Sequence, residues 1–523
     1  MSSNLDLIKK VADDLLQYLA ENADESQPTV RFTSETELAN AFKEAGASLD
    51  LADEAVAVDH EILHKAVRLV QHYSVRTGST NFNNQLYGTP DVVGVAGDWV
   101  STALNTNTHT YEVSPVFTTM ERSVLSKFAR KIGGRYVQGA NGEGGHDGLT
   151  LPGGSVCNQY AMHLARFKAV PEIKQKGMSV LLGKKLVAFT SADSHYSYLK
   201  AVNMLGLGTD NLVKVKCDGL TGAMNAAALK VAVEECLAGG DVPFFVGTTA
   251  GTTVLGGFDP FDAIADICEE YKLWMHVDAS WGGGALFSRD AKTLDLMKGA
   301  NRSDSMGWNP HKIVGAPLQC SLFLISYDET THDFFKRANG ASASYLFQPD
   351  KNHSNLDMGD KTLHCGRKGD ALKMWLMWKA LGDEGLGKRV DHLIGLIGHM
   401  SKEIGTIVDD KGRYCFVQVA PTQYANLCFY AVPPSLRVEP GSEGKRFDPY
   451  IATKSQMEYI KTIAPKLKDR MQKKGLALIG FQPIGDSLPN CWRMVTAGAK
   501  EVNFTTETID RILSSLVELN ADL

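Results

Sequence analysis

Short apolar runs alternate with longer amphipathic stretches through the middle of the chain. Continuous apolar runs of four to eight residues are typical of strands that are buried on both faces. Strands that alternate with helices predict a mostly parallel sheet covered by helices, which is an α/β fold. The runs are "KLVAFTS" (185–191), "VPFFVGTTAG" (242–251), "LWMHVDAS" (273–280) and "QCSLFLIS" (319–326).

The amphipathic stretches carry signals for helix starts and stops. Ser114 is a good N-cap, Pro115 suits the first helical position, and Gly133 stops the run. Asp259-Pro260 is predicted to cap a later helix. In the first of these helices the apolar residues that recur at helical spacing are Val116, Met120, Val124 and Phe128.

The rhythm differs at the two ends of the chain. Residues 1–80 indicate helices joined by polar turns, and past about residue 385 the alternation loosens. There "YANLCFYAV" and "NCWRMVTA" are predicted strands. We therefore expect a helical N-terminal segment (1–113), a large α/β domain (114–385) and a small α+β domain (386–523).

Composition and charge narrow the class of protein only a little. The chain has 523 residues, 44% hydrophobic and 22% charged, with a net charge of −6. This balance gives no overall basic field that would favour nucleic acid or an anionic membrane as partner. The nine cysteines are scattered singly, a pattern that favours a reducing cytoplasm and argues against a zinc site. No apolar run reaches the length of a membrane span, and the acidic N-terminal stretch is unlike a signal peptide.

Three polar signals follow predicted turns or strands, where parallel sheets bind ligands. "PGGSVCN" is a glycine turn opening a helix, which can bind an anion but is more often only a turn. Asp278 ends an apolar strand and is either a satisfied core acid or the partner of a ring cation. Lys312 follows "NP" and a histidine, and is either solvated or a desolvated amine that can form a Schiff base.

The three signals together match the needs of pyridoxal phosphate. That cofactor requires a cradle for its phosphate, an acid beside its ring nitrogen and a lysine for its aldehyde. Each signal has an ordinary structural explanation when taken alone. Their joint occurrence favours a site for this cofactor.

Longer motifs carry a resemblance that covers nearly the whole chain. "HVDASWGGGALFSRD", "SMGWNPHKIVGAPLQCS", "YLFQPDK" and "LKMWLMWKA" resemble the group II pyridoxal-phosphate amino acid decarboxylases. Within that family they are similar to the cysteine sulfinate, aspartate and glutamate branch. The resemblance implies a fold type I, aspartate-aminotransferase-like homodimer with active sites at the subunit interface. It also implies decarboxylation of an acidic amino acid, with cysteine sulfinate favoured, then aspartate, then glutamate.

The resemblance assigns cofactor roles to matching positions. Lys312 resembles the Schiff-base lysine, Asp278 the partner of the pyridine nitrogen, and His195 the histidine that stacks on the ring. The remaining matches are Gly154 and Ser155 in the phosphate turn, Asn309 and His311 near the phosphate, and Thr253 near the ring hydroxyl. Without the resemblance, His195 reads as an ordinary satisfied or exposed histidine, and Thr253 as a residue that caps a turn.

The same resemblance assigns substrate roles. Arg493 resembles the arginine that forks the substrate α-carboxylate, a geometry that lysine cannot reproduce. Gln85 resembles a residue lining the distal pocket, although a surface amide is the alternative. His109 stands where relatives commonly carry an aromatic residue, and either contacts the acidic side chain of the substrate or fills space.

One departure from the family pattern bears on the reaction. Most relatives of this branch carry a loop tyrosine thought to protonate the carbanion, and here His353 lies at that place. A histidine can donate a proton near neutral pH, so decarboxylation can survive the exchange. The alternatives are an oxygen-dependent aldehyde synthase, a non-catalytic homologue that binds partners, and a transaminase. The "NPHK" setting of Lys312 disfavours the last of these.

Overall fold

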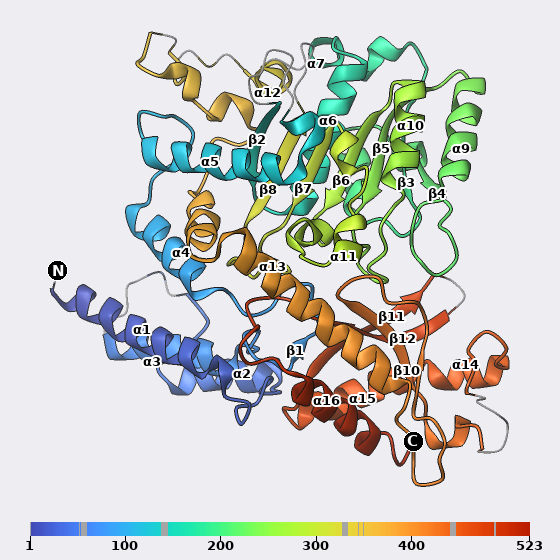
Figure 1. Cartoon of the computed structure of the whole chain (residues 1–523). Helices are drawn as coiled ribbons and strands as arrows, with labels where there is room; N and C mark the ends of the chain where they lie inside the picture. The colour runs from blue at the N-terminus through green and yellow to red at the C-terminus, as the bar shows by residue number, and fades with distance from the viewer. Residues whose placement is uncertain are drawn as a thin grey trace.

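The computed structural model places two sheets side by side, with one long helix crossing between them (Figure 1). It describes residues 2–51, 53, 60–137, 145–326, 333–341, 343, 345–348, 350–439, 446–485 and 488–523. The long helix, α13 (Ala371–Ile404), kinks at Gly382, where φ is 62°. It packs on the large sheet's helices at one end and near the small sheet at the other.

The large sheet has seven strands in the order β2-β8-β7-β6-β5-β3-β4. β8 runs opposite to the other six strands, so the mostly parallel α/β sheet expected from the alternating pattern is confirmed. Each strand predicted from an apolar run is present, and β2, β4 and β7 were not predicted. The strands are β2 (His146–Leu151), β3 (Leu186–Ser191), β4 (Leu212–Val215), β5 (Val242–Thr249), β6 (Trp274–Ala279), β7 (Ser305–Trp308) and β8 (Ser321–Ser326).

Helices cover both faces of this sheet because its strands are apolar on both sides. In β3, Val187 and Phe189 belong to one hydrophobic cluster, while Leu186 and Ala188 belong to the other. The first cluster includes residues of α5 (Pro115–Ile132), α9 (Ala226–Ala238), α10 (Phe261–Tyr271) and α13. The second includes residues of α6 (Gly154–Ala169), α7 (Ile173–Lys176), α8 (Ser197–Met204) and α12 (Phe334–Asn339).

The small sheet has five strands in the order β1-β11-β12-β10-β9. Its first strand comes from the N-terminal part of the chain and pairs in parallel with β11. The strands are β1 (Phe82–Asn83), β9 (Phe416–Gln418), β10 (Asn426–Ala431), β11 (Leu478–Ile484) and β12 (Leu488–Val495). The other helices are α1 (Ser2–Ala20), α2 (Glu35–Glu44), α3 (His60–Tyr73), α4 (Val92–Leu104), α11 (Ala291–Asp295), α14 (Lys454–Ile460), α15 (Ile463–Lys473) and α16 (Thr506–Leu519).

Three local predictions need correction. Ser114 precedes α5, but its hydroxyl makes no cap hydrogen bond. Asp259 does not cap α10, since its carboxylate accepts hydrogen bonds from the amides of Met224 and Thr249, which tie two loops together. Val116 is 58% exposed, because the buried face of α5 is turned toward Glu121 and its partners.

The predicted division of the chain stays a prediction. The boundary expected at residues 385/386 falls inside α13, three residues beyond the kink at Gly382. Among the described residues, none of the helices is both long and apolar enough to cross a lipid bilayer.

Candidate active site

The carboxyl ends of β5, β6 and β7 lie next to one another and bring the three polar signals together. Strand register places Asp278 of β6 beside Thr249 of β5 and Gly307 of β7. Lys312 follows β7 after a short turn, in which its amide donates to the Asn309 carbonyl at 3.0 Å. This edge is where parallel sheets expose ligand sites.

Asp278 is 5% exposed and is held by two donors. Oδ2 accepts from Asn158 Nδ2 at 2.8 Å, and Oδ1 accepts from the Ser280 amide at 3.0 Å. Burial works to raise the pKa of Asp278, but the nearby Lys312, His195 and the two donors outweigh it, so the pKa is lowered. The carboxyl group is therefore ionised and fixed in orientation.

Lys312 lies close enough to Asp278 for the two charges to interact. Burial lowers the pKa of Lys312, and the positive charge of Arg493 acts in the same direction, whereas Asp278 opposes both. Within the described part of the chain its Nζ has no hydrogen-bond or ion-pair partner. The amine is thus desolvated and is not held in a hydrogen bond or ion pair by the described residues, as a nucleophilic lysine requires.

His195 follows β3 and sits beside the same acid. Burial lowers its pKa, while Asp278 raises it and Lys312 and Lys200 lower it further. Its Nδ1 is 2.8 Å from the Ser197 hydroxyl and accepts from the Ser197 amide at 3.2 Å. The imidazole is therefore neutral near pH 7 and anchored through one nitrogen.

The predicted phosphate turn has a left-handed glycine at its centre. Gly153 has φ 104°, which side chains with a Cβ rarely adopt, and α6 begins at Gly154. A Cβ built on Gly154 would lie 2.2 Å from Ser280 Oγ and 2.7 Å from Asn309 Nδ2. Gly154 must therefore lack a Cβ for Ser280 and Asn309 to approach it. A Cβ built on Gly153 would meet nothing within 4 Å, so the N-terminus of α6 is open on that side, an arrangement suited to an anion. Ser155 is the second residue of this helix.

His311 is buried behind the turn of Lys312. Its Nδ1 is 2.6 Å from the Cys320 carbonyl, and burial lowers its pKa to about 4. Asn309 is anchored in a similar way, since its Oδ1 accepts from Ser321 Oγ at 2.8 Å. Both side chains are thus fixed, and Asn309 lies next to the predicted phosphate turn.

Arg493 joins the two sheets at this edge. It lies on β12 of the small sheet and is 8% exposed. Its Nη1 donates to the Thr253 carbonyl at 3.1 Å, just beyond β5, and Nη2 donates to the Asn84 carbonyl at 2.8 Å. Its Nε is buried without a partner among the described residues. Of the five N–H donors of a guanidinium, three remain after these two bonds, enough to bind a carboxylate.

Three predicted residues lie apart from this cluster in the single chain. Gln85 is exposed. His353 is also exposed, with φ 62°, and its ring is 5.3 Å from that of Tyr111. His109 is partly buried, and its carbonyl accepts from the Gly359 amide at 2.7 Å. No hydrogen bond, ion pair or ring contact joins these side chains to Lys312 or Asp278 in the described ranges.

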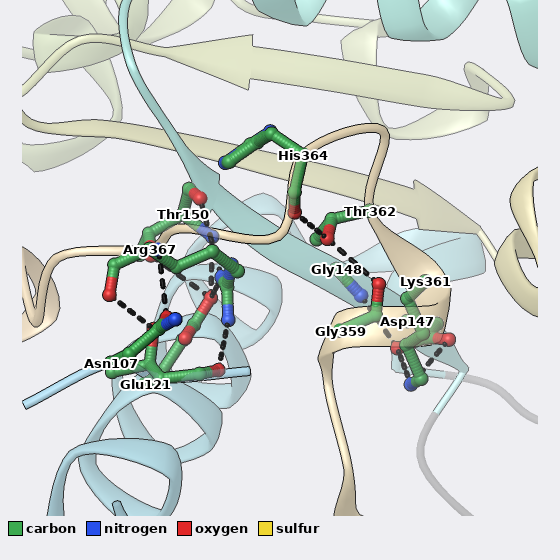
Figure 2. Close-up of polar contacts among 11 residues, drawn as sticks. Asn107, Glu121, Asp147, Gly148, Thr150, Gly359, Lys361, Thr362, His364 and Arg367 are labelled. Atoms are coloured by element: carbon green, nitrogen blue, oxygen red, sulfur yellow. Dashed lines mark hydrogen bonds and ion pairs between the residues drawn. The ribbon is translucent and has the colours of Figure 1, made fainter. Parts of the chain in front are cut away.

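Two ion pairs tie the segment that contains His353 to the large sheet (Figure 2). Lys361 Nζ lies 2.9 Å from Asp147 at the start of β2. Arg367 Nη2 lies 2.5 Å from Glu121 of α5, and both side chains are buried. Glu121 also accepts from the Thr150 amide, and Arg367 also donates to the Thr108 carbonyl. The segment around His109 is therefore fixed to β2 through Arg367.

Sequence reasoning missed Asn158, Ser197 and His276, which hydrogen bond around Asp278 and His195. The sequence does contain a signal for Asn158. It lies four residues after Gly154, so the two residues share one face of the helix. Ser197 begins α8 two residues after His195. His276 precedes Asp278 by two residues, which places both side chains on one face of β6.

The residues present fit pyridoxal phosphate. The turn at Gly153 borders open space at the start of α6, Asp278 is an ionised acid with free lone pairs, and Lys312 is an amine without a hydrogen-bond partner among the described residues. These are the three groups that the cofactor needs for its phosphate, ring nitrogen and aldehyde.

Comparison with known proteins agrees with this chemistry. The model of the "Pyridoxal-dependent decarboxylase conserved domain" family matches residues 46–432. Cysteine sulfinic acid decarboxylase of Rattus norvegicus is 43% identical over 476 residues, which are 91% of this chain and 89% of that protein. Acidic amino acid decarboxylase GADL1 of Bos taurus is 42% identical over 91% of this chain and 84% of that protein.

Solved structures show the same fold. The crystal structure of mouse CSAD superposes with a TM-score of 0.88 at 38% identity, covering 100% of this chain and 99% of that chain. The structure of Oryza sativa TDC with PLP and tryptamine has a TM-score of 0.81 at 21% identity, covering 99% and 98% of the two chains. The second likeness extends the fold to distant sequences and says nothing of substrate.

Proposed function

Because this chain belongs to the family of pyridoxal-dependent decarboxylases, we propose that it releases the α-carboxyl group of an acidic amino acid as CO₂. It is a lyase that uses pyridoxal phosphate. We propose cysteine sulfinate as the preferred substrate, giving hypotaurine, followed by aspartate and then glutamate. The names of the rat and bovine relatives support an acidic substrate.

One observation carries the proposed site: the desolvated, unpartnered amine of Lys312 faces an ionised Asp278 that is fixed by two donors. Pyridoxal phosphate, when bound, supplies an aldehyde that condenses with amines and a ring that accepts the electron pair of the broken bond. Lys312 would hold that aldehyde, and Asp278 would keep a proton on the ring nitrogen. The α6 turn with Gly154 and Ser155, together with Asn309 and His311, would hold the phosphate.

Arg493 would orient the substrate. Its remaining N–H donors can bind the α-carboxylate, and its bonds to the Thr253 and Asn84 carbonyls keep the guanidinium plane in place. A carboxylate held by a fixed guanidinium has one defined direction for its bond to the α-carbon. Orientation of this kind can contribute several kcal/mol to catalysis, about 7–11 in well-ordered cases.

His195 and His353 are the proposed proton carriers. His195 is held beside Asp278 and would lie against the cofactor ring, where it can donate a hydrogen bond. His353 stands on an exposed segment and would return the proton to the α-carbon once that segment covers the site. Its exposure in the single chain also keeps the oxygen-dependent aldehyde synthase as a second candidate, because a carbanion that is not protonated can react with oxygen.

We further propose a homodimer in a reducing cytoplasm. Several large apolar side chains of α4 and α5 are exposed in the single chain, and a subunit contact would bury such side chains. All nine cysteines are free, as expected where disulfides do not persist. Light scattering on the purified protein would measure the mass of the particle. The exposed residues are Val92, Val100, Leu104 and Val116.

A substrate panel tests the proposal. Purified protein with pyridoxal phosphate is offered cysteine sulfinate, cysteate, aspartate and glutamate, and amine, CO₂ and oxygen uptake are measured. We expect hypotaurine from cysteine sulfinate at the highest kcat/KM, with no oxygen consumed. Oxygen uptake with peroxide release would identify an aldehyde synthase, and no turnover of any acid would favour a non-catalytic homologue.

The Lys312→Ala variant is the control for the site. It removes the amine that would bind the aldehyde, so we expect it to lose the visible absorbance band of the bound cofactor along with activity. A retained band with full intensity would contradict the role proposed for Lys312.

A further inference from the structure

A continuous chain of buried side-chain hydrogen bonds runs beneath the site from β6 to α8. It begins at an indole N–H and ends on the two groups proposed to face the cofactor ring, Asp278 and His195. All its members except His195 are buried. The contacts are Trp274 Nε1 to Ser305 Oγ (2.8 Å), Ser305 Oγ to His276 Nδ1 (2.9 Å), His276 Nε2 to Asn158 Oδ1 (3.0 Å), Asn158 Nδ2 to Asp278 Oδ2 (2.8 Å) and to Ser197 Oγ (2.9 Å), and Ser197 Oγ to His195 Nδ1 (2.8 Å).

At the indole end, one bond has a fixed direction and the next is free to follow it. Indole N–H can only donate, so Ser305 Oγ accepts from Trp274. The hydroxyl proton of Ser305 is then free to point at His276 Nδ1, which can accept it. A neutral imidazole that accepts at Nδ1 carries its proton on Nε2.

The carboxylate end demands the same arrangement. An ionised carboxylate only accepts, so Asn158 must turn its NH₂ toward Asp278 and its Oδ1 toward His276. That oxygen needs a donor, which is the Nε2–H of His276. The two ends of the chain therefore agree on one tautomer of His276, whose burial lowers its pKa to about 4 and keeps it neutral.

The second amide proton of Asn158 sets the other branch. It donates to Ser197 Oγ, whose own proton has only one acceptor in reach among the described residues, the Nδ1 of His195. The Ser197 amide donates to the same nitrogen at 3.2 Å. A proton on Nδ1 would face both donors, so the ring proton of His195 belongs on Nε2.

We propose that Asn158, with His276 behind it and Ser197 in front, is a positioning residue that orients Asp278 and selects the Nε2–H tautomer of His195. One amide group thereby sets two groups of the site at once. The inference rests on the proposed function in one respect, that Asp278 and His195 face the cofactor. The consequence is that His195 can donate from Nε2 and cannot accept there.

Histidine ¹⁵N spectra of the substrate-free holoenzyme test the tautomers directly. Protein labelled only at its fourteen histidines gives one pair of nitrogen resonances for each ring. The pairs of His195 and His276 are assigned by their loss in His195→Gln and His276→Gln. We expect a pyridine-type Nδ1 and a pyrrole-type Nε2 in both rings at neutral pH. A proton on Nδ1 of either ring, or a doubly protonated ring, would overturn the proposal.

Variants separate the two branches. Ser197→Ala removes one of two donors to His195 Nδ1, so that resonance moves downfield while affinity for pyridoxal phosphate stays within about twofold. Asn158→Leu keeps the approximate volume and removes both donations. It shifts the same resonance and weakens cofactor binding by about 10- to 100-fold, because a hydrogen bond to a charged group is lost.

Thr248→Val is the matched control. It also deletes a buried hydroxyl beside the network, one that donates to the His276 carbonyl rather than to a side chain of the chain. It leaves both readouts unchanged if the network acts as proposed. If the His195 Nδ1 resonance shifts as far in Thr248→Val as in Ser197→Ala, the shift reflects general loosening of the protein around the site and not the loss of one hydrogen bond.

Should Asn158→Leu not fold, the Ser197→Ala shift and the wild-type tautomers still decide the question. Normal tautomers without turnover would refute the proposed function and leave this inference standing.

Discussion

The cofactor end of the site and the segment around His353 are built in opposite ways. Asp278 lies at the end of β6, and Asn309 and Lys312 follow β7, in a sheet that is buried on both faces. His353 stands on an exposed turn, and its one ring contact is with Tyr111 among the described residues. The first region is fixed by hydrogen bonds to every charged or polar group except the reactive amine. The second carries its ion pairs at its flanks, on Lys351, Lys361 and Arg367, and residues 357 and 359 are hydrogen bonded to backbone groups of the segment around His109.

This difference indicates a division of tasks. Holding a ring nitrogen, a phosphate and an aldehyde demands fixed groups, and strand ends provide them. Covering a substrate and returning a proton demands a group that can approach and leave, and surface segments provide that. We therefore expect substitutions in the first region to reduce turnover severely, and substitutions in the second to change what becomes of the substrate.

The largest effect is expected at Asp278. Asp278→Asn keeps the shape and removes the charge that would stabilise a protonated ring nitrogen, so kcat falls by at least about 10²- to 10³-fold. The melting temperature falls by a few °C, because the new amide has a single oxygen and either Asn158 or the Ser280 amide loses its acceptor. Steady-state kinetics and thermal unfolding check the pair of outcomes. A kcat within about threefold of the wild type would contradict the assignment.

Arg493 gives the next largest effect, in the small sheet. Arg493→Lys keeps a positive charge but cannot bond two carbonyls and a carboxylate together. We expect kcat/KM to fall by about 10- to 100-fold, and cofactor binding to remain normal because the cofactor groups lie in the other sheet. A matched loss of cofactor affinity would show that Arg493 belongs to the cofactor end instead.

His353 tests the other side of the comparison. His353→Phe removes a proton donor from an exposed position, so substrate consumption stays within about tenfold of the wild type while oxygen uptake rises relative to amine formation. The ratio of peroxide to amine, measured in the same reaction, is the readout. If both the ratio of peroxide to amine and the rate of substrate consumption are unchanged, His353 takes no part in the reaction.

The smallest effect concerns pH and the buried imidazole of His311. Burial lowers its pKa to about 4 in the folded protein, below the ordinary value near 6.5. The unfolded chain therefore binds more protons between these values, and stability is lost as pH falls from about 6.5 to 4. We expect the difference in melting temperature between wild type and His311→Asn to shrink by a few °C over that interval. A constant difference would contradict the buried neutral state.

Much of the large sheet was predictable because its strands are continuous apolar runs. β7 was not predicted, because it has only four residues, one of them glycine. Pairing with β6 and β8, rather than its own pattern, makes it a strand. Asp259 showed why local rules fail: a cap and a loop tie look alike until Met224 and Thr249 come together from distant positions.

The candidate site divides along similar lines. Lys312 and Asp278 could be proposed because Asp278 ends a predicted strand, and because the motifs around both residues resemble those of a family that binds pyridoxal phosphate. The partners of Asp278 in the hydrogen-bond chain were invisible because Asn158 reaches it across 120 residues. His109, Gln85 and His353 lie on segments whose placement depends on tertiary contacts such as Arg367 with Glu121, and no local pattern encodes those.

The two ion pairs that bracket residues 352–360 make this stretch a natural unit of exchange. Lys351 pairs with Glu112 at 3.0 Å on one side, and Lys361 pairs with Asp147 at 2.9 Å on the other. Both partners belong to parts of the chain outside the stretch, and the hydrogen-bond chain beneath the cofactor end does not touch it. A graft of the equivalent loop from another decarboxylase, joined at these two lysines and keeping the Asp357 and Gly359 bonds to residues 109–111, would therefore transplant reaction outcome without rebuilding the scaffold. This geometry would allow the function of the enzyme to diverge in evolution by replacement of this one short stretch.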